Sequence, residues 1–94
     1  VLSRRNVGLD AEELGRGMSP QLPRKVLSAG ELAQYENAWD KNRAFLTFWV
    51  LKEAAAKLRG TGLTGYPNDT NFSLDDPRVT EMDGCLVAVL EEGE

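Results

Sequence analysis

The sequence contains no histidine and only one cysteine, Cys85, among its 94 residues. Without histidine, neither a histidine general base nor a histidine-ligated zinc site can form. A single cysteine excludes an internal disulfide, and because Cys85 lies in an apolar run we interpret it as a small buried hydrophobic residue. No apolar run reaches transmembrane length, and no signal peptide is recognisable. These absences predict a cytoplasmic protein that makes no contact with a membrane.

Basic residues are also scarce overall, since 11 lysines and arginines face 15 acids, for a net charge of −4. This balance argues against a nucleic-acid-binding protein. The charge is uneven, however: positions 41–59 hold five basic residues and one acid, whereas positions 75–94 hold seven acids and one base. A locally basic segment on an acidic chain suits one particular anionic ligand. The length and the 41% hydrophobic content predict one small globular domain.

A helix is predicted to end near position 60. Strong helix formers fill the stretch from Phe48 to Arg59, and Gly60 directly after Arg59 is a helix stop signal. Trp49, Glu53 and Lys57 follow one another at four-residue intervals and so share one side of this helix. By itself, the Glu53–Lys57 spacing is typical of a surface ion pair.

An extended segment is predicted around positions 6–12, because apolar and polar residues alternate there. Val7, Leu9 and Ala11 are expected to face the core, which places Asp10 and Glu12 together on the opposite face. Two carboxylates so close together either point into water or jointly hold a cation. The residues alone leave both interpretations open.

The remaining segments predict short helices and strands. Positions 15–27 read as a loop with a short turn of helix after Pro20. Ser28 and Glu31 form a capping box, and the helix that follows is expected to bury Leu32, Tyr35 and Trp39. Further on, the sequence predicts core positions at Phe45 and Phe48, a turn at 66–69, short strand fragments around Phe72, Leu74 and Val79, an Asp83-Gly84 hairpin turn of type I′, and a buried strand at 85–90. The predicted fold class is α+β, with a long helix packed on a small antiparallel β-sheet.

Two motifs together resemble those of the 4′-phosphopantetheinyl transferases, particularly the Sfp-type branch. The first is W-x-x-K-E-A-x-x-K-x-x-G-x-G-L, present here as Trp49, Lys52, Glu53, Ala54, Lys57, Gly60, Gly62 and Leu63. The second is G-L-D-A-E at positions 8–12, similar to the family's G-[IV]-D-[IV]-E motif, with Ala11 in place of Ile or Val. Their order and separation also match the family pattern.

The resemblance implies an enzyme that uses Mg²⁺ to transfer 4′-phosphopantetheine from coenzyme A to a serine of an acyl or peptidyl carrier protein. Asp10, Glu12 and Glu53 would be metal ligands, an all-oxygen set of the kind Mg²⁺ prefers, although Glu13 directly after Glu12 leaves open which of the two faces the metal. Glu53 would also act as the base toward the serine, directly or through water. Lys57 would neutralise the pyrophosphate and stabilise the leaving diphosphate, and Lys52 would contact either the coenzyme A phosphates or only solvent. Contacts with an acidic carrier protein are expected from three loop residues, namely Arg16, Arg24 and Lys25.

The resemblance also bears on domain organisation. Sfp-type enzymes have two similar lobes with the active site between them, and residues 1–94 correspond to the C-terminal lobe alone. We therefore expect either an additional N-terminal lobe in a longer polypeptide or self-association of this one. Two other interpretations stay open: a non-catalytic lobe that binds coenzyme A or a carrier protein, and an unrelated α+β interaction domain whose acidic half contacts a basic partner.

Overall fold

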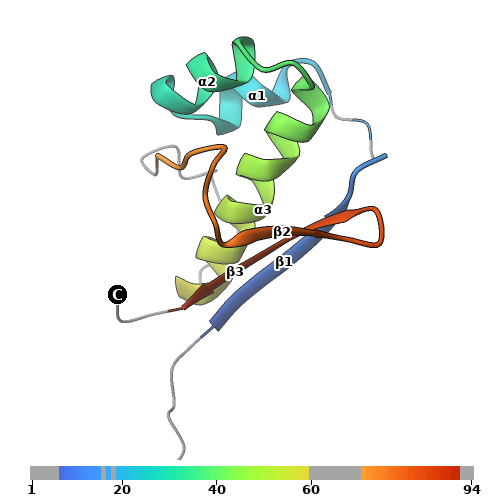
Figure 1. Ribbon diagram of the computed structural model, residues 1–94. Helices are drawn as coiled ribbons and strands as arrows, with labels where there is room; N and C mark the ends of the chain where they lie inside the picture. The colour runs from blue at the N-terminus through green and yellow to red at the C-terminus, as the bar shows by residue number, and fades with distance from the viewer. Residues whose placement is uncertain (1–6, 16, 18, 60–70, 92–94) are drawn as a thin grey trace, which may run out of the picture.

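A computed structural model describes residues 7–15, 17, 19–59 and 71–91, with the side chain of Arg59 excepted. In chain order the elements are β1 (Val7–Glu13), α1 (Leu22–Val26), α2 (Ala29–Glu36), α3 (Lys41–Arg59), β2 (Val79–Met82) and β3 (Cys85–Glu91). The predicted fold class is confirmed, since one long helix packs against a small antiparallel sheet (Figure 1). The predicted turn at 66–69 and the Gly60 stop signal lie outside the described residues.

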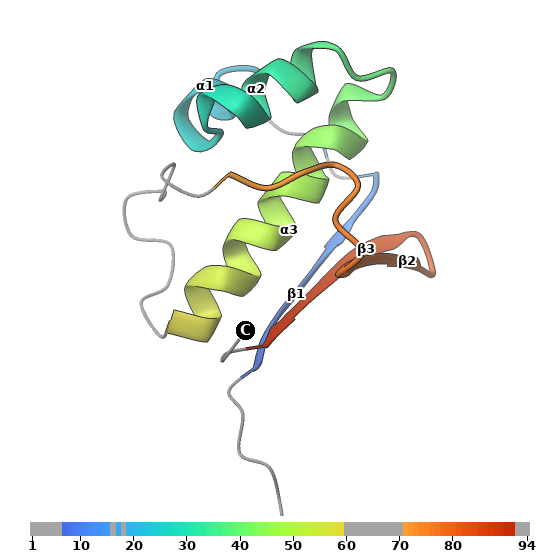
Figure 2. The same cartoon turned by 60° about the vertical axis from the view of Figure 1, so that its left-hand side comes forward.

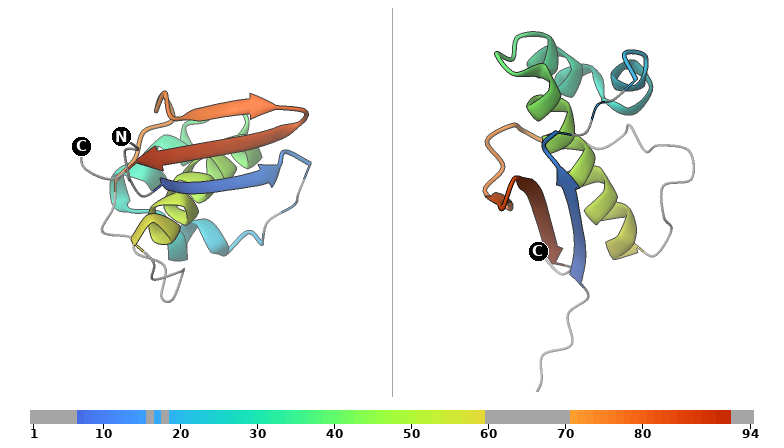
Figure 3. Two further views of the ribbon diagram at one scale, coloured as in Figure 1. Left: turned by 90° about the horizontal axis from the view of Figure 1, so that it is seen from below. Right: turned by 90° about the vertical axis from the view of Figure 1, so that its right-hand side faces the viewer.

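The sheet places β3 between the other two strands, in the order β1-β3-β2 (Figure 3). Both pairings are antiparallel, and Asp10 lies opposite Ala88 in the β1–β3 register. The β2–β3 connection is the predicted type I′ turn, because Asp83 and Gly84 have φ angles of 52° and 77°. This tight turn determines which residues of β2 and β3 pair. β1 is left at an edge of the sheet.

The long helix α3 is buried along most of its length: the sheet lies along it, and the two shorter helices pack across its N-terminal end (Figures 1 and 2). Toward the sheet, Leu46, Val50 and Ala54 pack with the inward residues of β3, Leu86, Ala88 and Leu90. Toward α1 and α2, the predicted core residues Phe45 and Phe48 are confirmed, with exposures of 1% and 0%. α3 is thus a rigid central element from which site residues can project.

β1 is oriented opposite to the prediction. Gly8 and Asp10 are buried toward α3, whereas Val7 and Leu9 are 52% and 53% exposed on the outer face of the sheet. The expectation that Val7, Leu9 and Ala11 face the core is therefore wrong. Alternation along a strand distinguishes two faces but does not state which is buried. Here specific contacts with α3, described below, determine the orientation.

Two smaller predictions were also wrong. Trp39 is fully exposed, because α2 ends at Glu36 and its helical periodicity does not extend to position 39. Phe72 and Leu74 lie in irregular chain, and only Val79 begins a strand. The short helix after Pro20 and the capping box at Ser28 and Glu31 are confirmed as α1 and the start of α2. Among the described residues, no helix is long and apolar enough to cross a membrane.

Candidate active site on β1 and α3

Gly8 allows the backbone of β1 to lie directly against α3. A Cβ atom at this position would overlap the carbonyl oxygen of Ala54 and come within 2.9 Å of the Leu58 Cβ. Only glycine permits so close an approach without moving the helix. The consequence is that the side chain two residues further along β1 reaches the last turn of α3, and the one four residues further along reaches its middle. A glycine inside a predicted strand was the sequence signal for this contact, and our sequence analysis did not use it.

The closest polar contact between the two elements is the ion pair of Asp10 and Lys57. The Lys57 Nζ donates to Asp10 Oδ1 at 2.9 Å and to the Leu9 carbonyl oxygen at 3.2 Å. The two partners differ in solvent exposure: the Asp10 side chain is 9% exposed, and that of Lys57 is 52% exposed. The structure thus brings together two of the predicted site residues, which lie 47 positions apart in the chain.

Glu12 also faces α3. Its Oε2 accepts a hydrogen bond of 3.2 Å from the indole nitrogen of Trp49, which is buried in the core. Glu13, in contrast, is exposed. Of the two acids at the end of the motif, Glu12 is therefore the one that shares a face with Asp10. Glu53 lies half-buried on α3, one turn before Lys57.

The electrostatics link these four residues. Burial raises the pKa of Asp10 above its ordinary value and the Glu12 charge adds to this effect, whereas the Lys57 ammonium opposes it. The pKa of Lys57 is raised, first by its hydrogen bond to Asp10 and further by the charges of Asp10, Glu53 and Glu12. Lys57 is thus a cation in the field of three carboxylates. The site combines a concentrated negative charge with one lysine that is accessible to solvent.

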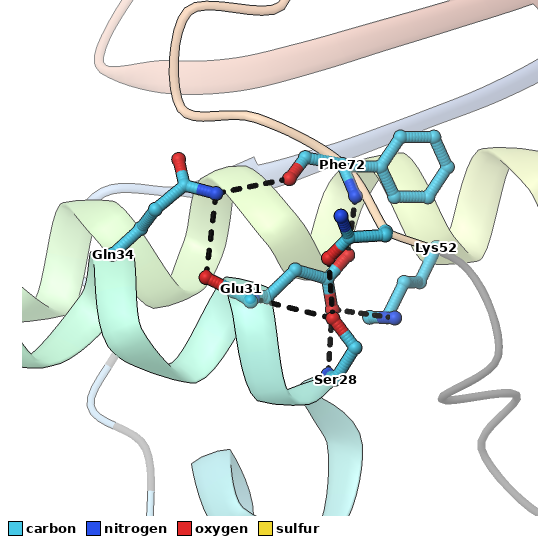
Figure 4. A network of polar contacts seen from close by, with 7 residues as sticks. Ser28, Glu31, Gln34, Lys52 and Phe72 are labelled. Carbon is cyan, nitrogen blue, oxygen red and sulfur yellow. Dashed lines mark hydrogen bonds and ion pairs between the residues drawn. The ribbon is translucent and has the colours of Figure 1, made fainter.

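Lys52 does not lie with the other predicted site residues. Its side chain is fully buried, and its Nζ forms an ion pair of 2.8 Å with Glu31 Oε1, which is equally buried (Figure 4). The same Oε1 accepts the Ser28 backbone N–H, and Glu31 Oε2 accepts that of Phe72 at 2.7 Å. Because its ammonium is enclosed by protein, we assign Lys52 to the core. This placement disagrees with both predicted contacts of Lys52, which were with coenzyme A phosphates or with solvent.

Glu31 is the buried charge that sequence reasoning missed. It was recognised as one half of the capping box, and the side chain does reach back to Ser28. Its second role, neutralising Lys52 on α3, is a contact across 21 positions that no local pattern indicates. The available signal was the lysine itself: Lys52 follows Leu51 on a helix buried on most sides, where an unpaired ammonium could not remain.

The fit of this site to a divalent cation is mixed. Asp10 Oδ2 is buried and has no hydrogen-bond partner among the described residues, and such an orphaned carboxylate oxygen is a suitable cation ligand. However, no three acidic, cysteine or histidine side chains within the described segments are gathered closely enough to hold a metal ion. The donor chemistry therefore fits Mg²⁺, but the side chains are not assembled around one point.

Two other surface features lie away from this group. Arg24 and Lys25 are exposed on α1, whereas Arg16, the third expected carrier contact, lies outside the described residues. A pocket of about 360 Å³ opens beside the N-terminal half of α3, lined by Trp39, Arg43, Thr47, Leu74 and their neighbours. None of the predicted site residues lines this pocket, so it adds nothing to the candidate site.

Fold and site together define a class: a small α+β domain whose edge strand presents two carboxylates to a lysine on the central helix. Comparison with protein-family models gives a match to the 4′-phosphopantetheinyl transferase superfamily over residues 6–86. The chain belongs to this superfamily, as its two motifs predicted. Searches of curated proteins and of solved structures found no match. Membership supports phosphopantetheinyl transfer at the level of the superfamily.

Proposed function

We propose that the protein transfers 4′-phosphopantetheine from coenzyme A to a serine hydroxyl of an acyl or peptidyl carrier protein. The observation that carries the proposal is the Asp10–Lys57 pair, which joins the two family motifs at one place between β1 and α3. Glu12 and Glu53 lie within electrostatic reach of the same lysine. This arrangement suits a reaction on a diphosphate, in which positioning and charge stabilisation supply most of the catalysis.

The chain's own residues have separate tasks in this reaction. Lys57, which is half exposed on a flexible stem, contacts the diphosphate and stabilises the charge that develops on the leaving 3′,5′-ADP. Glu53 accepts the proton of the carrier serine, directly or through a water molecule. The serine oxygen forms a bond to the β-phosphorus, and the bond from that phosphorus to the bridging oxygen breaks. Transfer is complete when 3′,5′-ADP departs.

A divalent cation, Mg²⁺ by its preference for oxygen ligands, would be held by Asp10, Glu12 and Glu53. When bound, it supplies charge neutralisation at the phosphate oxygens. The orphaned Oδ2 of Asp10 supports this role. The buried position of Asp10 keeps the carboxylate in one orientation, and the Trp49 hydrogen bond does the same for Glu12.

The proposal is tested with the purified protein, coenzyme A, Mg²⁺ and a panel of apo carrier proteins. Mass spectrometry should show that a carrier serine gains one phosphopantetheine group. Glu53→Gln should lower the transfer rate by about 10²-fold or more, the usual contribution of a general base. Glu36→Gln, at an exposed position at the end of α2, is the matched control and should leave the rate unchanged.

Two results would contradict this function. If coenzyme A binds but no carrier in the panel is labelled, with or without self-association, the non-catalytic interpretation of the lobe is favoured. If Glu53→Gln transfers at the full rate, Glu53 is not the base. The expected additional lobe or self-association stays a prediction, which a mass measurement of the protein in solution tests directly.

A further inference from the structure

The ammonium group of Lys57 is hydrogen-bonded to β1, although its side chain is half exposed. Two hydrogen bonds hold its ammonium, one to the Asp10 carboxylate at 2.9 Å and one to the Leu9 carbonyl oxygen at 3.2 Å. An exposed lysine side chain gains little from a single ion pair, because ordering its four-carbon stem costs entropy. Contact with both a buried carboxylate and a backbone oxygen indicates a defined seat for the ammonium group.

This binding position lies beside the one carboxylate in the described segments that has a buried oxygen without a partner. Asp10 Oδ1 is covered by Lys57, while Oδ2 is buried with no hydrogen bond from the described residues. The charges of Glu12 and Glu53 also act on Lys57. The ammonium is therefore the direct counter-ion of Asp10, and it also lies in the field of Glu12 and Glu53.

A divalent cation and this ammonium compete for the same negative charge. The described part of the chain contains no assembled group of three ligands, and Lys57 covers one of the two carboxylate oxygens of Asp10. The two partners are unequal in mobility: Asp10 is buried on a paired strand, whereas Lys57 is half exposed and can leave without disturbing the core. The lysine is the side chain that can move.

We propose that Lys57 is an exchangeable counter-ion that excludes divalent cations from the acidic site until a diphosphate draws the lysine away from Asp10. This inference rests on the proposed function, because it takes the diphosphate of coenzyme A and a divalent cation as the two ligands. Once the ammonium binds phosphate oxygens, Asp10 is free to accept the cation. Diphosphate and cation binding are then positively coupled, and each ligand strengthens the other by the same factor.

The coupling has a use in the proposed reaction. A site built only of three carboxylates would bind Mg²⁺ whether or not substrate is present. A site in which Asp10 is already paired with Lys57 recruits the cation only together with the diphosphate. The lysine that leaves Asp10 is also the one that contacts the substrate. Movement of this single side chain therefore couples diphosphate binding to cation binding.

The first test measures Mn²⁺ binding to the protein without any phosphate ligand, by the electron paramagnetic resonance signal of the free ion. Lys57→Met keeps an unbranched side chain that is one atom shorter and removes its charge. It should bind Mn²⁺ about tenfold more tightly than the unmodified protein, within the usual range of such couplings. Lys57→Arg, which keeps the charge, should bind Mn²⁺ as weakly as the unmodified protein. Lys41→Met is a control at an exposed lysine whose ammonium contacts only the Glu36 and Ala38 carbonyl oxygens in the described structure.

The second test uses the unmodified protein, so it does not depend on how the variants fold. The carboxyl carbon resonance of Asp10 is followed by nuclear magnetic resonance while inorganic pyrophosphate is added in the absence of metal. A shift of this resonance indicates that Lys57 leaves Asp10. An unshifted resonance at saturating pyrophosphate, or a Lys57→Met protein that binds Mn²⁺ no more tightly, overturns the inference.

These outcomes are separable from those of the proposed function. If carrier proteins are labelled but Lys57→Met shows no gain in Mn²⁺ affinity, the transferase function stands and the counter-ion role fails. If neither the unmodified protein nor the Lys57→Met variant binds Mn²⁺ even with pyrophosphate present, the metal-binding part of the proposed function fails. The inference then fails with it.

Discussion

At the scale of single residues, the candidate site depends on a position that has no side chain. Gly8 lets the strand lie on the carbonyl oxygen of Ala54, and this close approach brings Asp10 within 2.9 Å of Lys57. A methyl group here would have to push the helix away from the strand, because the obstructing atoms belong to backbone and to a Cβ. The glycine of the motif is thus a geometric requirement for the site, although it contributes no functional group.

Gly8→Ala should lower the free energy of unfolding by about 1–3 kcal/mol, the usual cost of overpacking. Gly15→Ala is the matched control: no atom lies within 4 Å of the Cβ it would add, and the expected change is within about 0.5 kcal/mol. Urea denaturation followed by circular dichroism measures both variants. Equal stability of the two would show that α3 does not need to approach β1 so closely.

At the scale of elements, β1 shows what sequence alone could and could not predict. The alternation from Val7 to Glu12 correctly predicted a strand with Asp10 and Glu12 on one face. The inward direction of that face could not be read from the pattern, since hydrophobicity favours the opposite orientation. Contacts made by Gly8, Asp10 and Glu12 with α3 decide the matter, and these contacts come from residues more than 35 positions away.

Paired leucine truncations on the two faces of the sheet test this orientation. Leu90 is 4% exposed within the core formed with α3, so Leu90→Ala should cost about 2–5 kcal/mol of stability. Leu9 is 53% exposed, and Leu9→Ala should cost less than about 1 kcal/mol. Chemical denaturation of both variants provides the measurement. A cost at Leu9 as large as that at Leu90 would place Leu9 in a core, contrary to the structure.

The other elements divide in the same way between local and distant causes. The capping box, the type I′ turn and the long helix each follow from residues adjacent in sequence, and each was predicted correctly. Trp39 was misplaced because a helical period was extended beyond the end of α2. Among the candidate site residues, Lys52 was misplaced because its partner Glu31 belongs to another helix. The Trp39 error is therefore local, whereas the Lys52 error arises where the tertiary structure overrides a local pattern.

At the scale of the whole molecule, one polar network joins three segments that hydrophobic packing alone would leave less well defined. Glu31 on α2 binds Lys52 on α3 and the backbone N–H of Phe72, and the Gln34 side chain donates to the Phe72 carbonyl oxygen (Figure 4). The Gln34 side-chain oxygen also accepts the backbone N–H of Leu74. Each buried charge has a partner of opposite sign, so the network is satisfied internally. It connects the two helices to the chain that leads into β2.

Lys52→Met should lower the free energy of unfolding by about 3–5 kcal/mol, because it leaves the Glu31 carboxylate buried without its counter-ion. The double variant Glu31→Gln with Lys52→Met should lose less than the single one, since no buried charge then remains uncompensated. Urea denaturation distinguishes the two. A single variant within about 1 kcal/mol of the unmodified protein would contradict the structural role of this pair.

The orientation of β1 has a consequence for how the molecule folds. β1 directs its acids inward and its valine and leucine outward, against the general tendency of a chain to bury apolar side chains. The strand is therefore locally frustrated. We expect such a strand to pack late in folding, once the helix that it contacts has formed. The segment that carries half of the candidate site would then separate from α3 before the rest of the molecule unfolds, and the site would be lost first.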